Sequence, residues 1–290
     1  MAADNSEKVW FITGSSTGFG RALAEAVLEK GYRLVATARK PEQLNDLVDR
    51  YPNQVKAVAL DVTNSQSVRE AVEAALNEFE QIDVLVNNAG YGTVGAIEEV
   101  SDDDIKRQFD TNLFGALNVT RAVLPTMREQ RSGHILNISS VGGIVSFAGV
   151  GMYCATKFAL EGVSEALAQE VKPLGIKVTI IEPGAFRTDF SGRSIVTPDH
   201  AIPDYAETSG KMIQWNQEID GKQPGDPVKA AAAMIQVVET ENPPLRLALG
   251  EDAVNGITQK LESMKAELEA WKDVSISTAF EGAKIGAIGG

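Results

Sequence analysis

The sequence contains one tyrosine and one lysine whose spacing suits proton transfer, Tyr153 and Lys157. Residues four apart project from one face of a helix, so the two side chains should lie close together. A free phenol has a pKa near 10 and is a poor base at neutral pH, but a neighbouring ammonium favours the phenolate. Only one of the five tyrosines has a lysine at this spacing, although such pairs also arise by chance. The pair predicts a phenol that donates a proton to a carbonyl oxygen or accepts one from an alcohol.

Two serines and one asparagine are candidate partners of this pair. Ser139 and Ser140 follow a predicted strand over residues 134–138. A hydroxyl there can donate to a substrate oxygen beside the tyrosine, or the two serines can simply be turn residues. Asn112 falls inside a predicted helix over residues 102–128, where asparagine is unfavourable. A buried amide or an ordered water as partner would explain it.

A glycine-rich turn connects a predicted strand over residues 9–12 to a predicted helix over residues 19–30. Such a turn places backbone N–H groups and the positive end of a helix against a pyrophosphate. We expect Gly14 to permit the turn, Gly18 to permit close approach of the ligand, and Gly20 to let the helix pack on the strand. The alternative is a purely structural turn. The predicted cofactor contacts here are Gly14, Ser16, Thr17, Gly18, Phe19 and Gly20.

The end of the second predicted strand, residues 33–38, indicates which dinucleotide is bound. An acid at this position would accept from a free ribose 2′-OH and repel a 2′-phosphate. The sequence has no acid there and has Arg39, whose guanidinium can bind a phosphate through two hydrogen bonds. Thr17 offers a second donor. We therefore predict NADP(H) rather than NAD(H), the alternative being a solvated arginine at a loop start.

Asp61 and Val62 follow the third predicted strand, residues 55–60. The carboxylate could accept from an adenine amino group, with the valine against the ring. An aspartate that opens a turn is an equally good interpretation of this residue.

Short apolar segments alternate with amphipathic ones along the chain. Strands that are apolar throughout imply a parallel sheet with helices on both faces. Right-handed crossovers make such a sheet doubly wound, and ligands bind beyond the carboxyl ends of its strands. We predict a single α/β domain over residues 1–290, with a Rossmann-type sheet of about seven strands. The predicted strands are residues 9–12, 33–38, 55–60, 84–86, 134–138, 177–181 and 246–249, and the predicted helices are residues 19–30, a segment after Pro41, residues 65–79, 102–128 and 151–172, and a last one with an apolar stripe of Leu261, Met264, Leu268 and Trp271.

Residues 186–227 interrupt this alternation. The segment has scattered glycine and proline and no clear strand, and a connection of this length is usually a lid or a binding loop. Because it follows a predicted strand on the ligand side, we predict a substrate lid. The alternative is an excursion that packs on its own apolar side chains. Those side chains are Phe190, Ile195, Tyr205, Met212 and Trp215.

The composition restricts the possible partners. The 290 residues carry a formal net charge of −13, which argues against nucleic-acid binding. No window approaches the roughly 18 apolar residues of a membrane span, and the first residues lack the apolar stretch of a signal peptide. We expect a cytoplasmic protein. With Cys154 as the single cysteine and two isolated histidines, the sequence predicts neither an intrachain disulfide nor a metal site.

These residues together resemble the short-chain dehydrogenase/reductase superfamily. The stretch from Tyr153 to Gly162 is most similar to the 17β-hydroxysteroid and retinol dehydrogenase branch. From residue 8 to at least residue 190, the family's order and approximate spacing are followed by the glycine motif, Asn87-Asn88-Ala89-Gly90, Asn112, Ser139, Tyr153-x-x-x-Lys157 and Pro183-Gly184.

The resemblance implies a role for each of these residues. Tyr153 would be the acid/base, Lys157 would bind the nicotinamide ribose and lower the tyrosine pKa, and Ser139 would orient the carbonyl. Asn112 would hold a water in a proton relay to Lys157. In this branch an arginine at the position of Arg39 accompanies NADP(H), although the family's basic residue before the second glycine is replaced by Thr17. The remaining residues expected to line the cofactor are Asn88, Ala89, Gly90, Pro183, Gly184 and Thr188.

We therefore expect an NADP(H)-dependent carbonyl reductase or alcohol dehydrogenase that interconverts an apolar secondary alcohol and a ketone by hydride transfer. An NAD(H)-dependent enzyme and a non-catalytic cofactor-sensing protein of the same fold are the alternatives. Family members usually form dimers or tetramers through two long helices, here residues 102–128 and 151–172. A homodimer or homotetramer is therefore expected by analogy.

Overall fold

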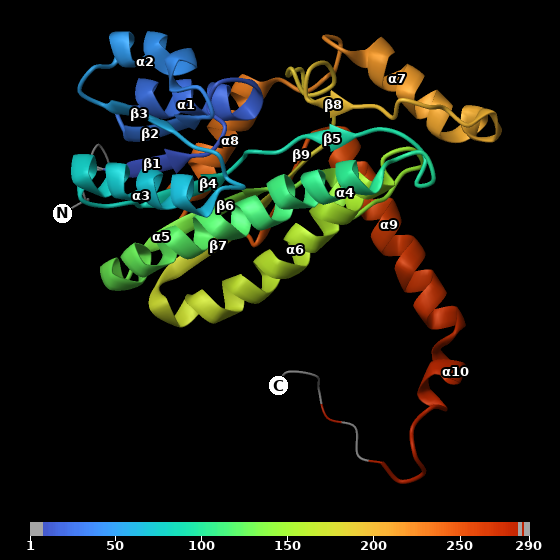
Figure 1. The fold of residues 1–290 in the computed structure, drawn as a ribbon. Helices are drawn as coiled ribbons and strands as arrows, with labels where there is room; N and C mark the ends of the chain where they lie inside the picture. The colour runs from blue at the N-terminus through green and yellow to red at the C-terminus, as the bar shows by residue number, and fades with distance from the viewer. Residues whose placement is uncertain (1–7, 284–285, 287–290) are drawn as a thin grey trace.

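A seven-stranded parallel sheet organises the protein (Figure 1). This computed structural model describes residues 8–283 and residue 286, so the N-terminal segment that argued against a signal peptide lies largely outside the described residues. The strand order reverses direction at β1, which is the switch point where ligands bind in such sheets. The predicted doubly wound sheet is confirmed. Its order is β3 (Val55–Ala59), β2 (Arg33–Ala38), β1 (Val9–Ile12), β4 (Val84–Asn87), β6 (Gly133–Ile138), β7 (Ile176–Pro183) and β9 (Arg246–Leu249).

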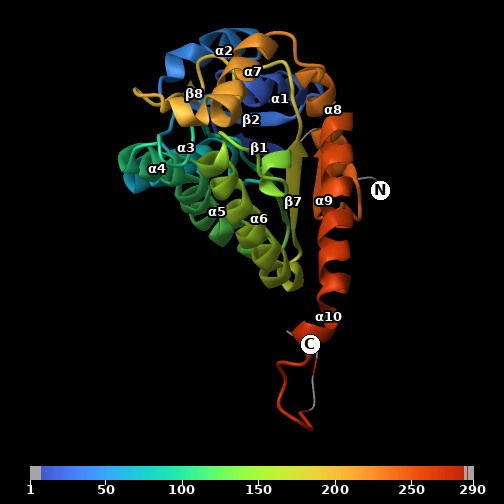
Figure 2. The same cartoon turned by 90° about the vertical axis from the view of Figure 1, so that its right-hand side faces the viewer.

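Helices cover both faces of the sheet, as Figures 1 and 2 show. Because side chains alternate along a strand, Trp10 and Ile12 enter one apolar core, whereas Val9 and Phe11 enter the other. The first core is closed mainly by α1 (Gly18–Glu29), α2 (Asn45–Arg50) and α8 (Pro227–Glu239), and the second by α3 (Ser65–Phe79), α5 (Ala116–Gln130) and α6 (Gly151–Val171). Helix α8 was not predicted from the sequence.

The predicted helix over residues 102–128 consists of three pieces. Helix α4 (Asp102–Phe109) begins with Ser101, whose side chain accepts a hydrogen bond from the Asp104 N–H and so caps the helix. The π-helical turn η3 (Asp110–Gly115) follows, and α5 continues the axis. A single π turn inside an α-helix often marks a functional site, and this one contains Asn112.

Residues 186–227 have more regular structure than predicted. The short strand β8 (Ile195–Val196) pairs in parallel with β5 (Gly92–Thr93), a segment just beyond β4. Helix α7 (Lys211–Ile219) follows, and the segment lies beside β5 in Figure 1. The short helical turns elsewhere are η2 (Pro41–Leu44), η4 (Val141–Gly143), η5 (Lys172–Leu174), η6 (Pro203–Tyr205) and η7 (Ala206–Gly210).

The C-terminal helices leave the body of the protein. Helix α9 (Glu251–Ala270) starts against β9 and η4 and then projects outward, with α10 (Lys272–Ile276) at its far end (Figures 1 and 2). Within the described residues, every helix is too short or too polar to cross a lipid bilayer.

Candidate active site

The glycine turn between β1 and α1 forms a cradle at the start of a helix. Gly14 and Gly18 have φ values of +69° and +57°, which favour glycine. The first turn of α1 has no acidic residue, and the Thr17 side chain makes no capping hydrogen bond. A Cβ added to Gly18 would meet only Thr188, at 3.6 Å. The positive helix end and the Thr17 hydroxyl are thus available to an anion such as a pyrophosphate.

Hydrogen bonds hold this cradle against the loop that follows β4. Thr13 Oγ1 accepts from the backbone N–H groups of Asn88 and Ala89, both at 2.9 Å. The Asn88 amide donates to the carbonyl oxygens of Thr13 and Gly14, at 2.9 and 3.1 Å. A Cβ on Gly20 would overlap the Gly14 carbonyl oxygen. The Asn88 side chain therefore braces the turn, a role that sequence reasoning did not assign.

The residues predicted to bind the adenosine end lie in different surroundings. Arg39 is exposed after β2 and makes no ion pair with any described residue. Asp61 Oδ1 accepts from the Thr63 N–H at 2.9 Å and from the Thr63 hydroxyl at 2.7 Å, as in the turn interpretation. Val62 is buried, and a Cβ on Gly115 would lie 2.5 Å from its Cγ2. Arg39 is thus the one of these groups that keeps all its donors for a ligand.

The first residues after β7 fold back over the glycine turn. The ring of Phe186 packs against that of Phe19, with 5.1 Å between the centroids. Thr188 lies over Gly18, as described above, and its Oγ1 accepts from the Phe190 N–H at 3.3 Å. The Phe19 side chain therefore contacts the predicted lid.

Lys157 lies on the same face of α6 as Tyr153, as predicted. Its ammonium donates to the Ile138 carbonyl oxygen at 2.8 Å and lies 5.7 Å from the centre of the Tyr153 ring. A Cβ on Gly90 would lie 3.7 Å from Lys157 Nζ. Burial lowers the pKa of Lys157 to about 8, and the Glu161 carboxylate opposes this effect. The lysine thus connects the strand end, the β4 loop and the tyrosine.

Tyr153 is half-buried, and the ring of Phe190 from the predicted lid covers it, with 5.5 Å between the centroids. Burial raises the pKa of Tyr153 to about 12, although a hydrogen bond with Ser140 opposes the rise. The expected fall of this pKa is therefore not a property of the protein alone. At neutral pH the phenol is protonated and suited to donate.

The two serines that follow β6 lie in different surroundings. Ser139 is 3% exposed, and its hydroxyl lies beside the Glu161 carboxyl, whose pKa it helps to lower against the larger effect of burial. Ser140 lies on the other side: a Cβ on Gly142 would be 3.3 Å from its Oγ and 3.4 Å from Tyr153 Cε1. The serine that faces the tyrosine is Ser140, because neighbouring residues at a strand end point in opposite directions.

Asn112 is buried in the π turn, and both N–H donors of its amide are occupied. Oδ1 accepts from the Tyr91 N–H at 3.0 Å, and Nδ2 donates to the Tyr91 carbonyl at 2.8 Å and to Thr156 Oγ1 at 3.1 Å. Of the two explanations given for Asn112, these contacts support the buried amide. The side chain fixes the β4 loop beside Lys157, and Oδ1 keeps one acceptor position that a water could use.

A cluster of buried charges behind the site was not predicted. Arg246 Nε lies 3.1 Å from Glu161 and 3.5 Å from Glu182, and both carboxylates are nearly inaccessible. Burial and the neighbouring Glu161 raise the pKa of Glu182 to about 7. Glu161 is four residues after Lys157 on α6, so this spacing was the available signal. Next to the cluster, Gly184 leaves room for Asp252, which accepts from the Ala185 N–H at 2.7 Å.

The parallel sheet, the glycine cradle and the tyrosine–lysine pair at the same sheet edge define a dinucleotide-binding oxidoreductase. The family model described as short chain dehydrogenase matches residues 8–197. The chain belongs to this family, and the suspected membership is confirmed.

Similar proteins cover nearly the whole chain. "Oxidoreductase BOA17" of Botryotinia fuckeliana is 43% identical over 94% of this chain and 99% of its own length. A "3-ketodihydrosphingosine reductase" of Bacteroides thetaiotaomicron is 42% identical over 84% of this chain and 88% of its own. A solved short-chain dehydrogenase of Streptomyces avermitilis has a TM-score of 0.88 at 48% identity, covering 94% and 98% of the two chains. More distant structures are complexes with NAD, at 26% identity, and with NADP+, at 25%.

Proposed function

We propose that this protein is an NADP(H)-dependent carbonyl reductase or alcohol dehydrogenase that interconverts an apolar secondary alcohol and a ketone. The observation that carries the proposal is the convergence of Tyr153, Ser140 and Lys157 beside the glycine cradle. When bound, the nicotinamide supplies or accepts the hydride. The residues of this chain then hold the substrate oxygen and exchange its proton.

In ketone reduction, the Ser140 hydroxyl donates to the carbonyl oxygen and holds it at Tyr153. The raised pKa keeps the phenol protonated until the oxygen gains negative charge, and the phenol then donates its proton. In the reverse direction the phenolate is needed, so the positive charge of Lys157 and of the oxidised cofactor must lower the tyrosine pKa. The expected lowering stays a prediction for the complex. In the predicted relay, a water would donate to the remaining acceptor position of Asn112 Oδ1, because both amide N–H groups are occupied.

The preference for NADP(H) over NAD(H) rests on Arg39. The relatives described above bind either cofactor, so the family leaves the choice open. Arg39 is exposed at the end of β2, where its guanidinium can bind a 2′-phosphate through two hydrogen bonds. Dissociation constants for NADPH and NADH should differ by at least about tenfold in the wild type, and Arg39→Ala should abolish the difference. Equal affinities in the wild type would favour the NAD(H) alternative.

An apolar substrate is supported by the residues around Tyr153. Phe190 covers the tyrosine, and Gly92 leaves room for both Phe190 and Ile195 from the predicted lid. The Bacteroides relative is named as the reductase of a keto compound. The finer resemblance to the 17β-hydroxysteroid and retinol dehydrogenase branch stays a prediction, because the relatives described are fungal and bacterial oxidoreductases.

Removal of the phenol tests the reaction directly. Tyr153→Phe should lower kcat by about 10²- to 10⁴-fold on a panel of apolar ketones and secondary alcohols, while the Kd for NADPH changes less than threefold. Phe keeps the ring that packs on Phe190. Unchanged turnover would refute the mechanism. Cofactor binding without turnover on any substrate by the wild type would favour the cofactor-sensing alternative.

The proposal includes a cytoplasmic homo-oligomer. Phe114 on η3 and Phe158 on α6 are 51% and 43% exposed, on the two long helices expected to pair with another copy. Large exposed aromatic side chains of this kind are typical of protein interfaces.

A further inference from the structure

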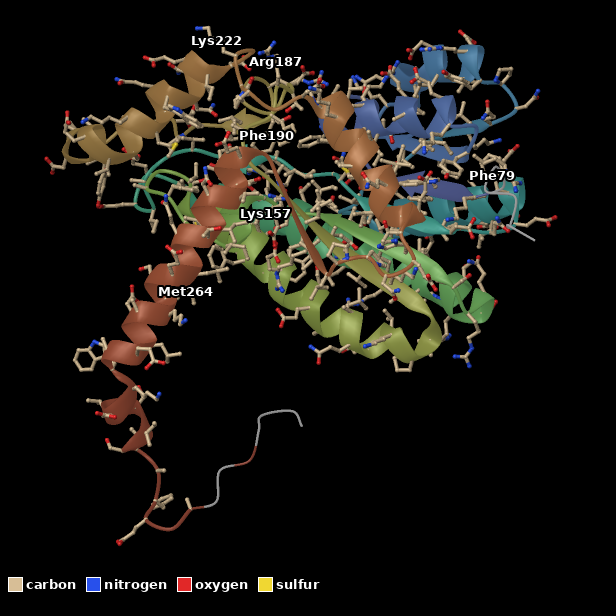
Figure 3. All side chains as sticks on the ribbon, turned by 180° about the vertical axis from the view of Figure 1, so that it is seen from behind. Phe79, Lys157, Arg187, Phe190, Lys222 and Met264 are labelled. Atoms are coloured by element: carbon tan, nitrogen blue, oxygen red, sulfur yellow. The ribbon has the colours of Figure 1, made fainter. Side chains whose placement is uncertain are left out.

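The projecting part of α9 carries an apolar stripe that no other described residue covers. Leu261, Met264, Leu268 and Trp271 are between 52% and 66% exposed. Figure 3 shows Met264 on the part of the helix that has left the body. The exposed apolar residues continue into α10 and to Phe280, which is 91% exposed. We call residues 261–280 the C-terminal arm. Apolar surface on this scale marks an interaction site.

The stripe has the spacing of a helix that pairs with another helix. Its members alternate at intervals of three and four residues, which is the a/d pattern of a coiled coil. The stripe begins where α9 still contacts the body, at Val254, which is 49% exposed, and Ile257, which is half-buried. It then runs the length of the helix. The six positions are Val254, Ile257, Leu261, Met264, Leu268 and Trp271.

We propose that this stripe binds α9 of a second copy of the same chain, with the two helices antiparallel. The a positions are Val254, Leu261 and Leu268, and the d positions are Ile257, Met264 and Trp271. In an antiparallel pair centred between residues 262 and 263, each a position faces a d position of the other helix. Leu261 then meets Met264 of the second copy. Ile257 meets Leu268, and Val254 meets Trp271. Every layer is apolar, and the two-fold axis repeats each contact.

The charges beside the stripe favour this direction. In the antiparallel pair, Lys260 lies opposite Glu267 of the second copy, and Glu251 lies opposite Lys272. Symmetry makes four attractive pairs. A parallel pair would keep one attraction, Glu267 with Lys272, but would place Lys260 beside Lys265 of the other copy. Like charges at such positions oppose association.

The shape and the overall charge favour the same partner. An antiparallel pair puts the two bodies at opposite ends, so that each C-terminal arm lies along the anchored half of the other α9. The C-terminal arm contains two lysines and four acids, so it has no basic face for an anionic membrane surface. The second copy thus accounts for both the apolar and the charged positions, and the proposed catalytic activity is not needed for this inference.

Charge exchange tests the proposal. The dimer contains two symmetry-related pairs between Lys260 and Glu267. Either Lys260→Glu or Glu267→Lys makes both pairs repulsive, so each variant should self-associate at least about tenfold more weakly than the wild type. A mixture of the two variants restores all pairs, and the mixed dimer should form with near wild-type affinity. The matched control is Glu262→Lys, a charge change on the outer face of α9. Sedimentation equilibrium across a concentration series measures all four samples.

The same experiment distinguishes the other possibilities. Stronger association of Lys260→Glu would indicate a parallel pair and overturn the proposed direction. A mixture that associates no better than either variant would refute the interface. The double variant Leu261→Glu/Leu268→Glu should lose the interface altogether, with an unchanged melting temperature of the body, because both side chains are exposed. Flotation of the wild type, but not of this variant, with phosphatidylcholine/phosphatidylglycerol vesicles would identify a lipid surface instead.

Discussion

At the scale of single residues, one position separates a hydroxyl that faces the tyrosine from one that does not. Asn137 and Ser139 are two apart on the β6 segment and point to the same helix-covered face, where Asn137 donates to Ser164 at 2.7 Å. Ser140 points the other way, toward Tyr153. Strand alternation predicts that Ser140 faces away from Asn137 and Ser139, but the sequence alone does not show which of the two faces holds Tyr153.

Exchange of each serine for alanine should separate the two roles. Ser140→Ala should lower kcat for ketone reduction by about 10²-fold or more, because the substrate oxygen loses its hydrogen-bond donor. Ser139→Ala should change kcat less than about threefold, since its hydroxyl lies beside Glu161. Steady-state kinetics with NADPH and the best ketone of the panel measures both. The reverse ranking would restore Ser139 as the catalytic serine.

The buried Glu182 should make stability depend on pH. Burial raises its pKa to about 7 in the folded protein, above the ordinary value of 4.5. The folded state then holds the proton more tightly than the unfolded state, so stability is highest at low pH and is lost as the pH rises through about 7. Glu182→Gln should reduce the loss between pH 5 and pH 8, which we expect to be on the order of 2 kcal/mol in the wild type. Urea unfolding at both pH values measures it.

Glu165→Gln is the matched control for this measurement. Glu165 contacts the same Arg246, at 2.6 Å, but is itself exposed. Its removal should leave the pH difference close to that of the wild type. If both variants reduced the difference equally, the effect would belong to Arg246 rather than to a buried carboxyl.

At the scale of elements, periodicity predicted those parts whose burial is uniform. The core strands such as β1 and β6 are buried almost throughout, so their apolar runs were readable in the sequence. Helix α8 could have been predicted. Asp226 and Pro227 are start signals at the N-cap and the first helical position, and the buried Ala230, Met234 and Val238 recur at helical spacing. The π turn η3 was missed because its cause is tertiary. Asn112 is held by Tyr91, twenty-one residues away, and no local sequence pattern predicts that contact.

The regular structure of the predicted lid was also missed because its cause is tertiary. Strand β8 is two residues long and exists because it pairs with β5, about one hundred residues earlier. Its sequence alone has no recognisable period. The site followed a similar division: the glycine turn and the Tyr153–Lys157 pair were local patterns, whereas the cluster of Glu161, Glu182 and Arg246 joins three separate elements. When the residues of a site lie on distant elements, the spacing between them in the sequence has no regular pattern that would predict the site.

The glycine turn provides a test at this scale. Gly20→Ala places a methyl group onto the Gly14 carbonyl oxygen, so we expect a loss of about 1–3 kcal/mol of stability and at least tenfold weaker NADPH binding. The control is Gly162→Ala on the exposed side of α6, where an added Cβ meets nothing within 4 Å. That change should stabilise by roughly 0.5–1 kcal/mol. Urea unfolding and fluorescence titration would measure both, and a tolerated Gly20→Ala would mean that the turn is looser than described.

At the scale of the whole molecule, the chain has two exposed apolar regions that suit two different contacts. Phe114 lies on the π turn η3 and Phe158 on α6, whereas the apolar stripe belongs to α9. Figures 1 and 2 show α9 projecting from the body of the protein. Each contact between identical faces is a two-fold interface. Two such interfaces whose axes intersect at right angles close into a tetramer of D2 symmetry, whereas axes that do not intersect give open chains.

The two interfaces should therefore be separable by substitution. Phe158→Glu puts a charge into the helix contact and should leave dimers held by α9, whereas Leu261→Glu/Leu268→Glu should leave dimers held by the long helices. Light scattering should give four subunits for the wild type, two for each variant, and one for the combination. A wild type that is already dimeric and is dissociated by Phe158→Glu alone would remove the α9 contact from the assembly. Heterogeneous masses that grow with concentration would instead indicate that the two interfaces build an open assembly, because each chain would then add to the next without limit.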